Sequence, residues 1–220
     1  MGGEKIMDNI NRVYSKLFAW LFLGLLICFG TGYGLYLNQD LMVTTLKTYL
    51  IPIVIAELVI ALVLSLRIQK LKPITTKILY LLFTAITGVT FSSLFVVYDL
   101  GSIIFIFLLT AIIFGILAFY GYITKRDLTN IGVILLVTLL VVIVASILNA
   151  IFFHSGSLNL GITILGALVF IGFIAYDMQK VKRMLPTIGE EKAAVFGAFQ
   201  LFLDFINLFI RLLELFGKKK

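Results

Sequence analysis

Seven long apolar runs constrain this chain more than any other feature of its sequence. Each is close to the length of about 20 residues that an α-helix needs to cross the hydrocarbon core of a bilayer. The connections between them are short, and none is rich in proline, serine or glycine. We therefore predict an all-α polytopic membrane protein, a single transmembrane domain over residues 1–220, with seven helices over approximately 17–37, 46–66, 78–98, 101–122, 131–152, 159–179 and 193–217.

The composition supports this fold class. Hydrophobic residues make up 61% of the chain and charged residues 13%, whereas a soluble domain is nearer one half apolar and one quarter charged. The net charge is +7, but the lysines and arginines form short clusters between the apolar runs. This pattern is typical of membrane connections and not of a nucleic-acid-binding face. The expected partner is the lipid bilayer, and no nucleic-acid partner is expected.

Lysine and arginine are unevenly distributed over the connections. The N-terminal tail and the second, fourth and sixth connections are basic, with Lys5, Arg12 and Lys16; Arg67, Lys70, Lys72 and Lys77; Lys125 and Arg126; and Lys180, Lys182, Arg183 and Lys192. The other connections are nearly free of ionisable residues: the first holds Asp40 and Lys47, the third Asp99, and the fifth His154. The positive-inside rule therefore places the N-terminus in the cytoplasm. Seven complete crossings leave the basic tail Lys218–Lys220 outside, against the same rule, so the sequence leaves the side of this tail open.

The last apolar run carries a narrow polar stripe. With about 100° of rotation per residue, its polar side chains fall within an arc of about 80°; they are Gln200, Asp204, Asn207, Arg211 and Glu214. Ionisable groups at membrane depth are costly and usually mark a path for ions or protons. A structural alternative remains, in which Asp204 and Arg211 form ion pairs with partners on neighbouring helices.

Asp177, at the end of the sixth run, and Asp204 are the main candidates for a functional pair. Two carboxylates that share a poorly hydrated site cannot both ionise cheaply, so the pair retains one proton and can respond to pH. Carboxylate oxygens also suit Ca²⁺, but a tight site needs six to eight oxygen ligands. We therefore expect a weak transit site for calcium at Asp177 and Asp204, and no tightly bound cofactor.

Helix geometry sets a condition on this pair. Asp177 lies near the expected membrane boundary, whereas Asp204 lies about 16 Å along its helix from Ala193, at a rise of about 1.5 Å per residue. The two carboxylates meet only if the sixth helix continues past Asp177 and the seventh begins outside the membrane, near Glu190. Pro186 and Gly189 are expected to end the sixth helix before the seventh begins.

The second apolar run contributes two further candidates. Glu57 and Arg67 are about 15 Å apart along a helix, too far for a direct ion pair. Glu57 lies near the middle of the membrane and needs a partner or water. Arg67 either extends to the membrane interface or acts as counter-ion to a carboxylate on another helix.

The third run carries small residues at helical spacing. Thr84, Gly88 and Ser92 recur every four residues. This spacing lets two membrane helices approach closely. We therefore expect this face to pack against another helix and not to carry chemistry.

The sequence does not predict an enzyme. The single histidine, His154, excludes a Ser-His-Asp triad, and the sequence has no HExxH, CxxC or glycine-rich phosphate loop. An intramembrane aspartyl protease is the enzymatic alternative, since it also uses two membrane aspartates. Tyr176 and Asp177 match half of its motifs, but Asp204 lies in FLDF without a glycine framework.

Four segments resemble the Bax inhibitor-1 family, also called the transmembrane Bax inhibitor motif family, and in particular its bacterial members. They are TGVTFSSLFVVY (87–98), YGYITKRDL (120–128), AYDMQK (175–180) and GAFQLFLDFINLFIRLLELFG (197–217). The resemblance implies six helices wrapped around a central C-terminal helix. It also implies a pH-sensitive calcium leak channel in the bacterial plasma (inner) membrane.

The resemblance also assigns roles to individual residues. It implies a di-aspartyl pH sensor at Asp177 and Asp204, an arginine latch at Arg67, and a glutamate that corresponds to Glu57. Some bacterial relatives are associated with a membrane-bound AAA protease. The alternative function is therefore that of a regulator that binds such a protease and transports nothing.

Overall fold

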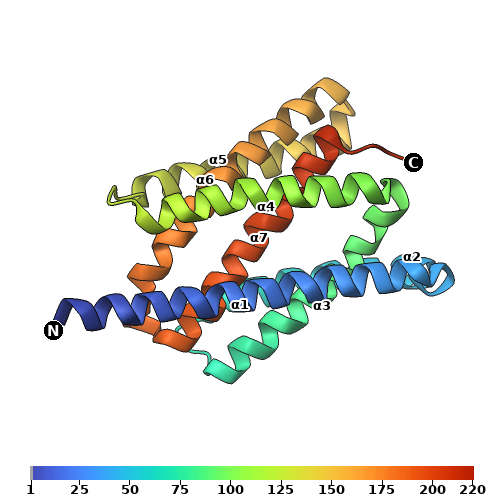
Figure 1. The fold of residues 1–220 in the computed structure, drawn as a ribbon. Helices are drawn as coiled ribbons and strands as arrows, with labels where there is room; N and C mark the ends of the chain where they lie inside the picture. The colour runs from blue at the N-terminus through green and yellow to red at the C-terminus, as the bar shows by residue number, and fades with distance from the viewer. Residues whose placement is uncertain (1) are drawn as a thin grey trace. The chain divides into compact units, whose positions relative to one another are not determined.

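In the computed structural model the chain is helical along almost its whole length. The structure describes the backbone of residues 2–220 and the side chains of residues 8–220. This described backbone contains no strand, and seven of its helices are long and apolar enough to cross a membrane, which confirms the predicted fold class. The elements are α1 (Gly2–Leu37), α2 (Gln39–Arg67), α3 (Pro73–Val97), α4 (Leu100–Ile123), α5 (Thr129–Leu148), the π-helical turn η1 (Asn149–Phe153), α6 (Gly156–Ile188) and α7 (Glu190–Phe216) (Figure 1).

The first connection is much shorter than predicted. Asn38 alone separates α1 from α2, and its side-chain oxygen accepts a hydrogen bond from the Leu41 amide at 3.2 Å. An asparagine cap satisfies a free amide of the first turn, so a helix can begin directly after it. The placement of Asp40 and Lys47 in a loop was therefore wrong, because both residues lie inside α2.

The break between α6 and α7 also differs from the prediction. Pro186 does not end α6, which continues to Ile188. The chain turns at Gly189 alone, whose φ of 78° lies in the left-handed region that glycine adopts without steric cost. As a result α6 extends eleven residues beyond Asp177 and α7 begins at Glu190. The sixth helix thus continues past Asp177 and the seventh begins at Glu190, as a meeting of Asp177 and Asp204 requires.

The chain forms two compact units. The first comprises Met1–Tyr98, Val181–Phe202 and Lys220, and the second comprises Asp99–Lys180 and Leu203–Lys219. Each unit therefore contains part of α6 and part of α7. In both units the α7 segment is largely covered by other helices, and α7 is the most buried of the seven candidate membrane helices found in the described part of the chain.

Small residues hold α1 against α3 in the first unit. The two helices lie side by side (Figure 1). Thr84 and Ser92 of α3 are fully buried, and a Cβ atom added to Gly88 would lie 2.5 Å from the carbonyl oxygen of Cys28 on α1. The predicted packing role of this small-residue face is therefore confirmed.

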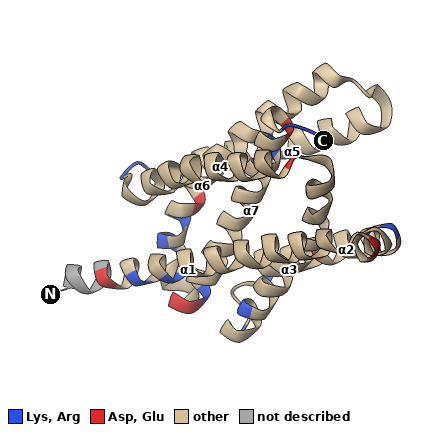
Figure 2. Ribbon diagram, turned by 45° about the vertical axis from the view of Figure 1, so that its right-hand side comes forward, with Lys and Arg blue, Asp and Glu red and all other residues tan. Residues whose placement is uncertain are grey.

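Three consecutive charged residues tie the start of α7 to the rest of the first unit. The Glu190 carboxylate pairs with Lys16 of α1 at 2.7 Å, and Glu191 pairs with Lys77 of α3 at 2.9 Å. Lys192 donates hydrogen bonds to two carbonyl oxygens just beyond α2. Figure 2 shows that charged residues gather near helix ends in this way. The basic N-terminal part of α1 and the α2–α3 connection therefore lie at the same end of the unit; the side chain of Lys5 lies outside the described residues.

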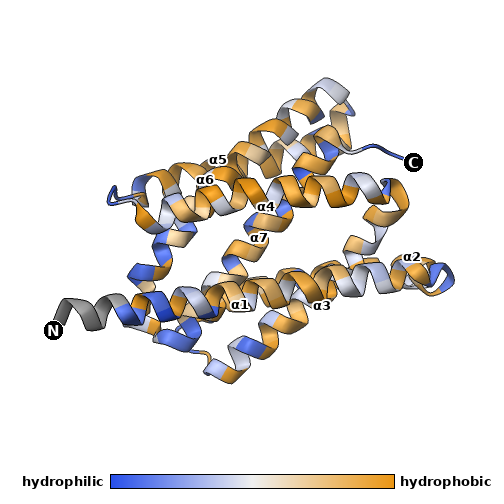
Figure 3. Ribbon diagram, in the orientation of Figure 1, coloured by the Kyte–Doolittle hydropathy of each residue, from blue (hydrophilic) through white to orange (hydrophobic). Residues whose placement is uncertain are grey.

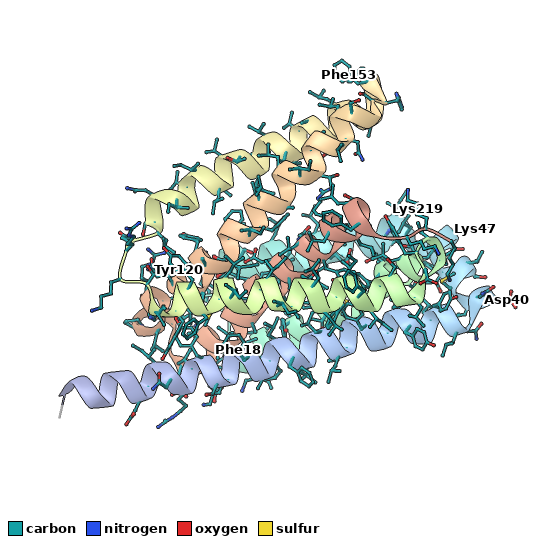
Figure 4. All side chains as sticks on the ribbon, turned by 45° about the horizontal axis from the view of Figure 1, so that its top comes forward. Phe18, Asp40, Lys47, Tyr120, Phe153 and Lys219 are labelled. Carbon is teal, nitrogen blue, oxygen red and sulfur yellow. The ribbon has the colours of Figure 1, made fainter. Side chains whose placement is uncertain are left out.

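Aromatic contacts join α4 to α7 in the second unit, while α5 presents a broad apolar surface. The Phe205 ring of α7 meets the rings of Phe107 and Phe114 of α4 edge-on, with centroids 5.2 and 5.6 Å apart. Figure 3 shows that α5 is hydrophobic along most of its length, and only 11% of the most apolar stretch of Thr129–Phe153 is buried. In the following turn Phe153 is 65% exposed and points away from the helices (Figure 4). Such surfaces are suited to lipid chains.

The C-terminal tail is anchored at a defined end of each unit. In the second unit the Asp99 amide donates to the Lys218 carbonyl oxygen at 2.9 Å. In the first unit the Lys220 ammonium donates to the Phe95 carbonyl oxygen at 2.7 Å and to the Tyr36 hydroxyl at 2.9 Å. Because Tyr36 lies in the last turn of α1, Lys220 lies at the end of the first unit opposite to the start of α1.

We predict that Gly88→Ala destabilises the protein. The new methyl group would meet backbone atoms of α1, which cannot rotate away, and overpacking of this kind costs about 1–3 kcal/mol. Thermal unfolding in detergent should show a lower midpoint than for the wild type. Gly30→Ala is the matched control, because no atom lies within 4 Å of a Cβ atom at that position. Equal midpoints for both variants would contradict the close α1–α3 contact.

The anchored tail predicts that the two ends of α1 mark opposite sides of the membrane. In a Cys28→Ser background, Lys219→Cys should react with an impermeant maleimide added outside spheroplasts. Lys70→Cys should react only after permeabilisation, because the α2–α3 connection lies at the other end. Labelling of both positions from the same side would show that α7 does not cross completely.

Candidate functional site

The structure brings Asp177 and Asp204 together within the second unit. Asp177 lies on α6 and Asp204 on α7, and their residues are only 6% and 4% exposed. The two carboxyl groups interact electrostatically. Two acidic groups thus share one buried location, as the sequence-based hypothesis requires, while their role as a sensor stays a prediction.

Lys180 supplies a positive charge beside this pair. Its ammonium lies 3.8 Å from Asp177 Oδ1 and 5.7 Å from the centre of the Tyr176 ring, and it also interacts electrostatically with Asp204. One ammonium can balance only one of two ionised carboxylates. Sequence analysis assigned Lys180 to the α6–α7 connection, although its spacing of three residues from Asp177 on a helix is a recognisable ion-pair signal.

The second oxygen of Asp204 is the unusual atom of the site. Asp204 Oδ2 is buried and has no hydrogen-bond partner within the described part of the protein. A buried polar oxygen without a partner is costly, and far more so when it is charged. A proton, a water molecule or a cation at this oxygen would therefore lower the free energy of the site.

The turn of α6 that carries Asp177 is held by neighbouring helices. A Cβ atom on Gly121 of α4 would collide with the Ala175 carbonyl oxygen, and one on Gly132 of α5 would collide with the Tyr176 ring. The Gln179 side chain accepts a hydrogen bond from the amide just before α5 at 2.9 Å and donates to the carbonyl oxygen of Arg126 at 2.7 Å. These contacts were not predicted from the sequence, where only the two glycines indicated a close approach of helices.

The other polar residues of the α7 stripe have different environments. In the first unit Gln200 has a buried side-chain oxygen without a hydrogen-bond partner among the described residues. In the second unit Asn207 donates to a carbonyl oxygen of its own helix at 2.8 Å. Arg211 pairs at 3.0 Å with Glu214. The alternative hypothesis placed its ion partner on a neighbouring helix, but Glu214 also belongs to α7.

Glu57 and Arg67 both lie in the first unit. The half-buried Glu57 accepts a hydrogen bond of 3.4 Å from the Thr90 hydroxyl of α3, and it interacts electrostatically with the Cys28 thiol of α1. Arg67 occupies the last turn of α2, where it is exposed and forms no ion pair with any side chain of residues 8–220. The latch and counter-ion roles of these two residues stay predictions.

The site offers a cation few ligands. Within the described residues, no group of three or more His, Cys, Asp or Glu side chains could hold a metal ion. Asp177 and Asp204 provide four carboxylate oxygens at most, fewer than a tight calcium site needs. The donor set is chemically suitable for Ca²⁺ but only for weak binding.

Comparison with known proteins gives consistent similarity over nearly the whole chain. A family model described as "Inhibitor of apoptosis-promoting Bax1" matches residues 10–220. The Inner membrane protein YbhL of Escherichia coli K12 is 38% identical over 220 residues, which cover 96% of this chain and 94% of that protein. An uncharacterized protein of Borreliella burgdorferi is 35% identical, in an alignment that covers 96% of this chain and 93% of that protein. An uncharacterized protein of Deinococcus radiodurans is 32% identical, in an alignment that covers 98% of this chain and 94% of that protein.

Proposed function

We infer, because this chain belongs to the Bax inhibitor-1 family of membrane proteins, that it forms a pH-sensitive calcium leak channel gated by Asp177 and Asp204. The observation that carries this proposal is the burial of both carboxyl groups at one location between α6 and α7. The permeant species is the calcium ion, and protons compete with it for the same oxygens. The absence of a nucleotide-binding motif from the sequence favours passive flux.

The chemistry of the pair supports a pH response. Two like charges at short range in a poorly hydrated site resist simultaneous ionisation, so the pair titrates as a unit. When the pair is ionised, it attracts Lys180 at 3.8 Å. Protonation removes that attraction, and protons compete with Ca²⁺ for the same carboxylate oxygens. That acid favours the open state is what the family resemblance implies.

We further propose that the protein lies in the bacterial inner membrane with its N-terminus in the cytoplasm. The E. coli relative is named an inner membrane protein, which supports this choice of membrane. The basic residues at the start of α1, in the α2–α3 connection and at the start of α7 lie at one end of the first unit, which supports the orientation under the positive-inside rule.

We predict that the purified protein conducts Ca²⁺ without ATP into dye-loaded liposomes, and that flux rises between about pH 8 and pH 6. Asp177→Asn and Asp204→Asn should each lose most of this pH dependence, because one remaining carboxyl group lacks its like-charged partner. The double variant should add little. Asp40→Asn, which removes an exposed carboxylate in the first turn of α2, is the control and should behave as the wild type.

Two outcomes would contradict this assignment in different ways. If the effects of the single variants simply add, or Asp204→Asn keeps the full response, the pair is not the sensor, and Glu57 or Glu214 becomes the next candidate. Flux equal to that of empty liposomes at every pH would favour the second function, a regulator that binds a membrane-bound AAA protease. Co-purification from bacterial membranes would then test for that partner.

Arg67 provides a separate test of the latch. If its guanidinium holds the channel closed, Arg67→Ala should raise flux at neutral pH toward the acid value and weaken the pH response. Arg67→Lys distinguishes charge from the planar geometry that suits carboxylates. Lys70→Ala is the control for loss of a nearby positive charge. Unchanged flux together with reduced expression would show that Arg67 only reaches the membrane interface.

A further inference from the structure

We propose that Arg211 forms a charge barrier in series with Asp177 and Asp204, and that Glu214 sets the height of this barrier. The inference rests on the proposed calcium leak. It assigns a throughput-limiting role to an ion pair that the pH-sensing mechanism does not use. All the residues involved belong to the second unit.

The contacts of Arg211 fix its guanidinium between α6 and α7. One terminal nitrogen lies 3.0 Å from Glu214 Oε2, and the Thr163 hydroxyl of α6 donates to the same oxygen at 3.1 Å. Gly166 of α6 leaves the space that the arginine fills, because a Cβ atom there would lie 3.2 Å from Arg211 Nε. Glu214 thus accepts hydrogen bonds from residues of both helices, and the Arg211 side chain lies against the backbone of Gly166.

This cluster lies on the same pair of helices as the carboxylates. Arg211 follows Asp204 by two helical turns, about 10 Å along α7 and on nearly the same face. The contacts of Thr163 with Glu214 and of Gly166 with Arg211 show that α6 and α7 run antiparallel along this stretch. For a cation that leaves the acidic pair along the polar stripe toward the C-terminal end of α7, Arg211 is therefore the next charged side chain.

A fixed guanidinium at this position repels a divalent cation. Charged side chains in narrow paths act as electrostatic barriers. The Arg211 and Glu214 side chains are 23% and 36% exposed, so water screens part of this repulsion. Glu214 offsets part of the arginine charge, so the intact pair is a low barrier. A purely structural pair is the competing explanation, although exposed pairs three residues apart on a helix contribute little to stability.

The two members of the pair should therefore have opposite effects on flux. In calcium-flux measurements on liposomes, Arg211→Gln should raise flux several-fold at both pH 6 and pH 8 and leave the midpoint of the pH response unchanged. Glu214→Gln should lower flux, since it leaves the positive charge without compensation. The double variant should behave like Arg211→Gln, and Arg211→Lys should stay near the wild type.

The controls separate this role from a structural one. Arg126→Gln removes an exposed arginine from a connection of the same unit and should leave flux unchanged. Thermal unfolding of every variant is measured in parallel. Lower stability of Arg211→Gln and Glu214→Gln without opposite changes in flux would overturn the barrier and leave the leak intact. A wild type that passes no Ca²⁺ would overturn both proposals.

Discussion

The burial of two carboxyl groups between helices with lipid-facing apolar surfaces is the constraint on which the second unit depends. Hydrocarbon cannot solvate an ionised carboxylate, so acidic side chains at this depth must face protein, water or a counter-ion. Asp177 has Lys180 at 3.8 Å, whereas one oxygen of Asp204 has no hydrogen-bond partner in the described structure. The protonation of the pair and the packing of α6 against α7 are therefore linked, because a change in one alters the free energy of the other.

Close backbone contact, and not loop structure, positions these groups. Membrane helices gain little from hydrophobic association with one another, since lipid tails are equally apolar, so small residues and van der Waals contact determine their packing. Gly121 and Gly132 let α4 and α5 reach the turn of α6 that carries Asp177. In the first unit, Gly88 of α3 allows a similarly close approach to α1. A site supported in this way can shift only if whole helices move, which suits a gate with two discrete states.

The sequence was sufficient to predict the seven helices and the packing face of α3. It also singled out Asp177 and Asp204 as a candidate pair, but it made their meeting conditional on where the two helices end. Hydropathy predicted the helix ends incorrectly. It reports the length of the apolar stretch, whereas the helices continue beyond that stretch into polar residues. Asp40 and Lys47 therefore lie in α2, and α6 passes through Pro186. The ion pair of Lys180 with Asp177 was missed because the end of the sixth helix was placed before Lys180. The contact of Thr163 with Glu214 joins residues 51 positions apart, and neither composition nor periodicity carries information on such a tertiary contact.

The basic C-terminal tail conflicted with the positive-inside rule, and its contacts provide a physical reason. Lys220 donates its ammonium hydrogen bond to the Phe95 carbonyl oxygen and its amide to the Val97 carbonyl oxygen, both in the last turn of α3. The ammonium also lies 4.9 Å from the centre of the Tyr36 ring. A cation is favourable at a helix C-terminus, where the carbonyl groups lack helical partners and the helix dipole is negative. The charge of Lys220 therefore caps α3, which gives a basic residue a local stabilising role at this end of the first unit.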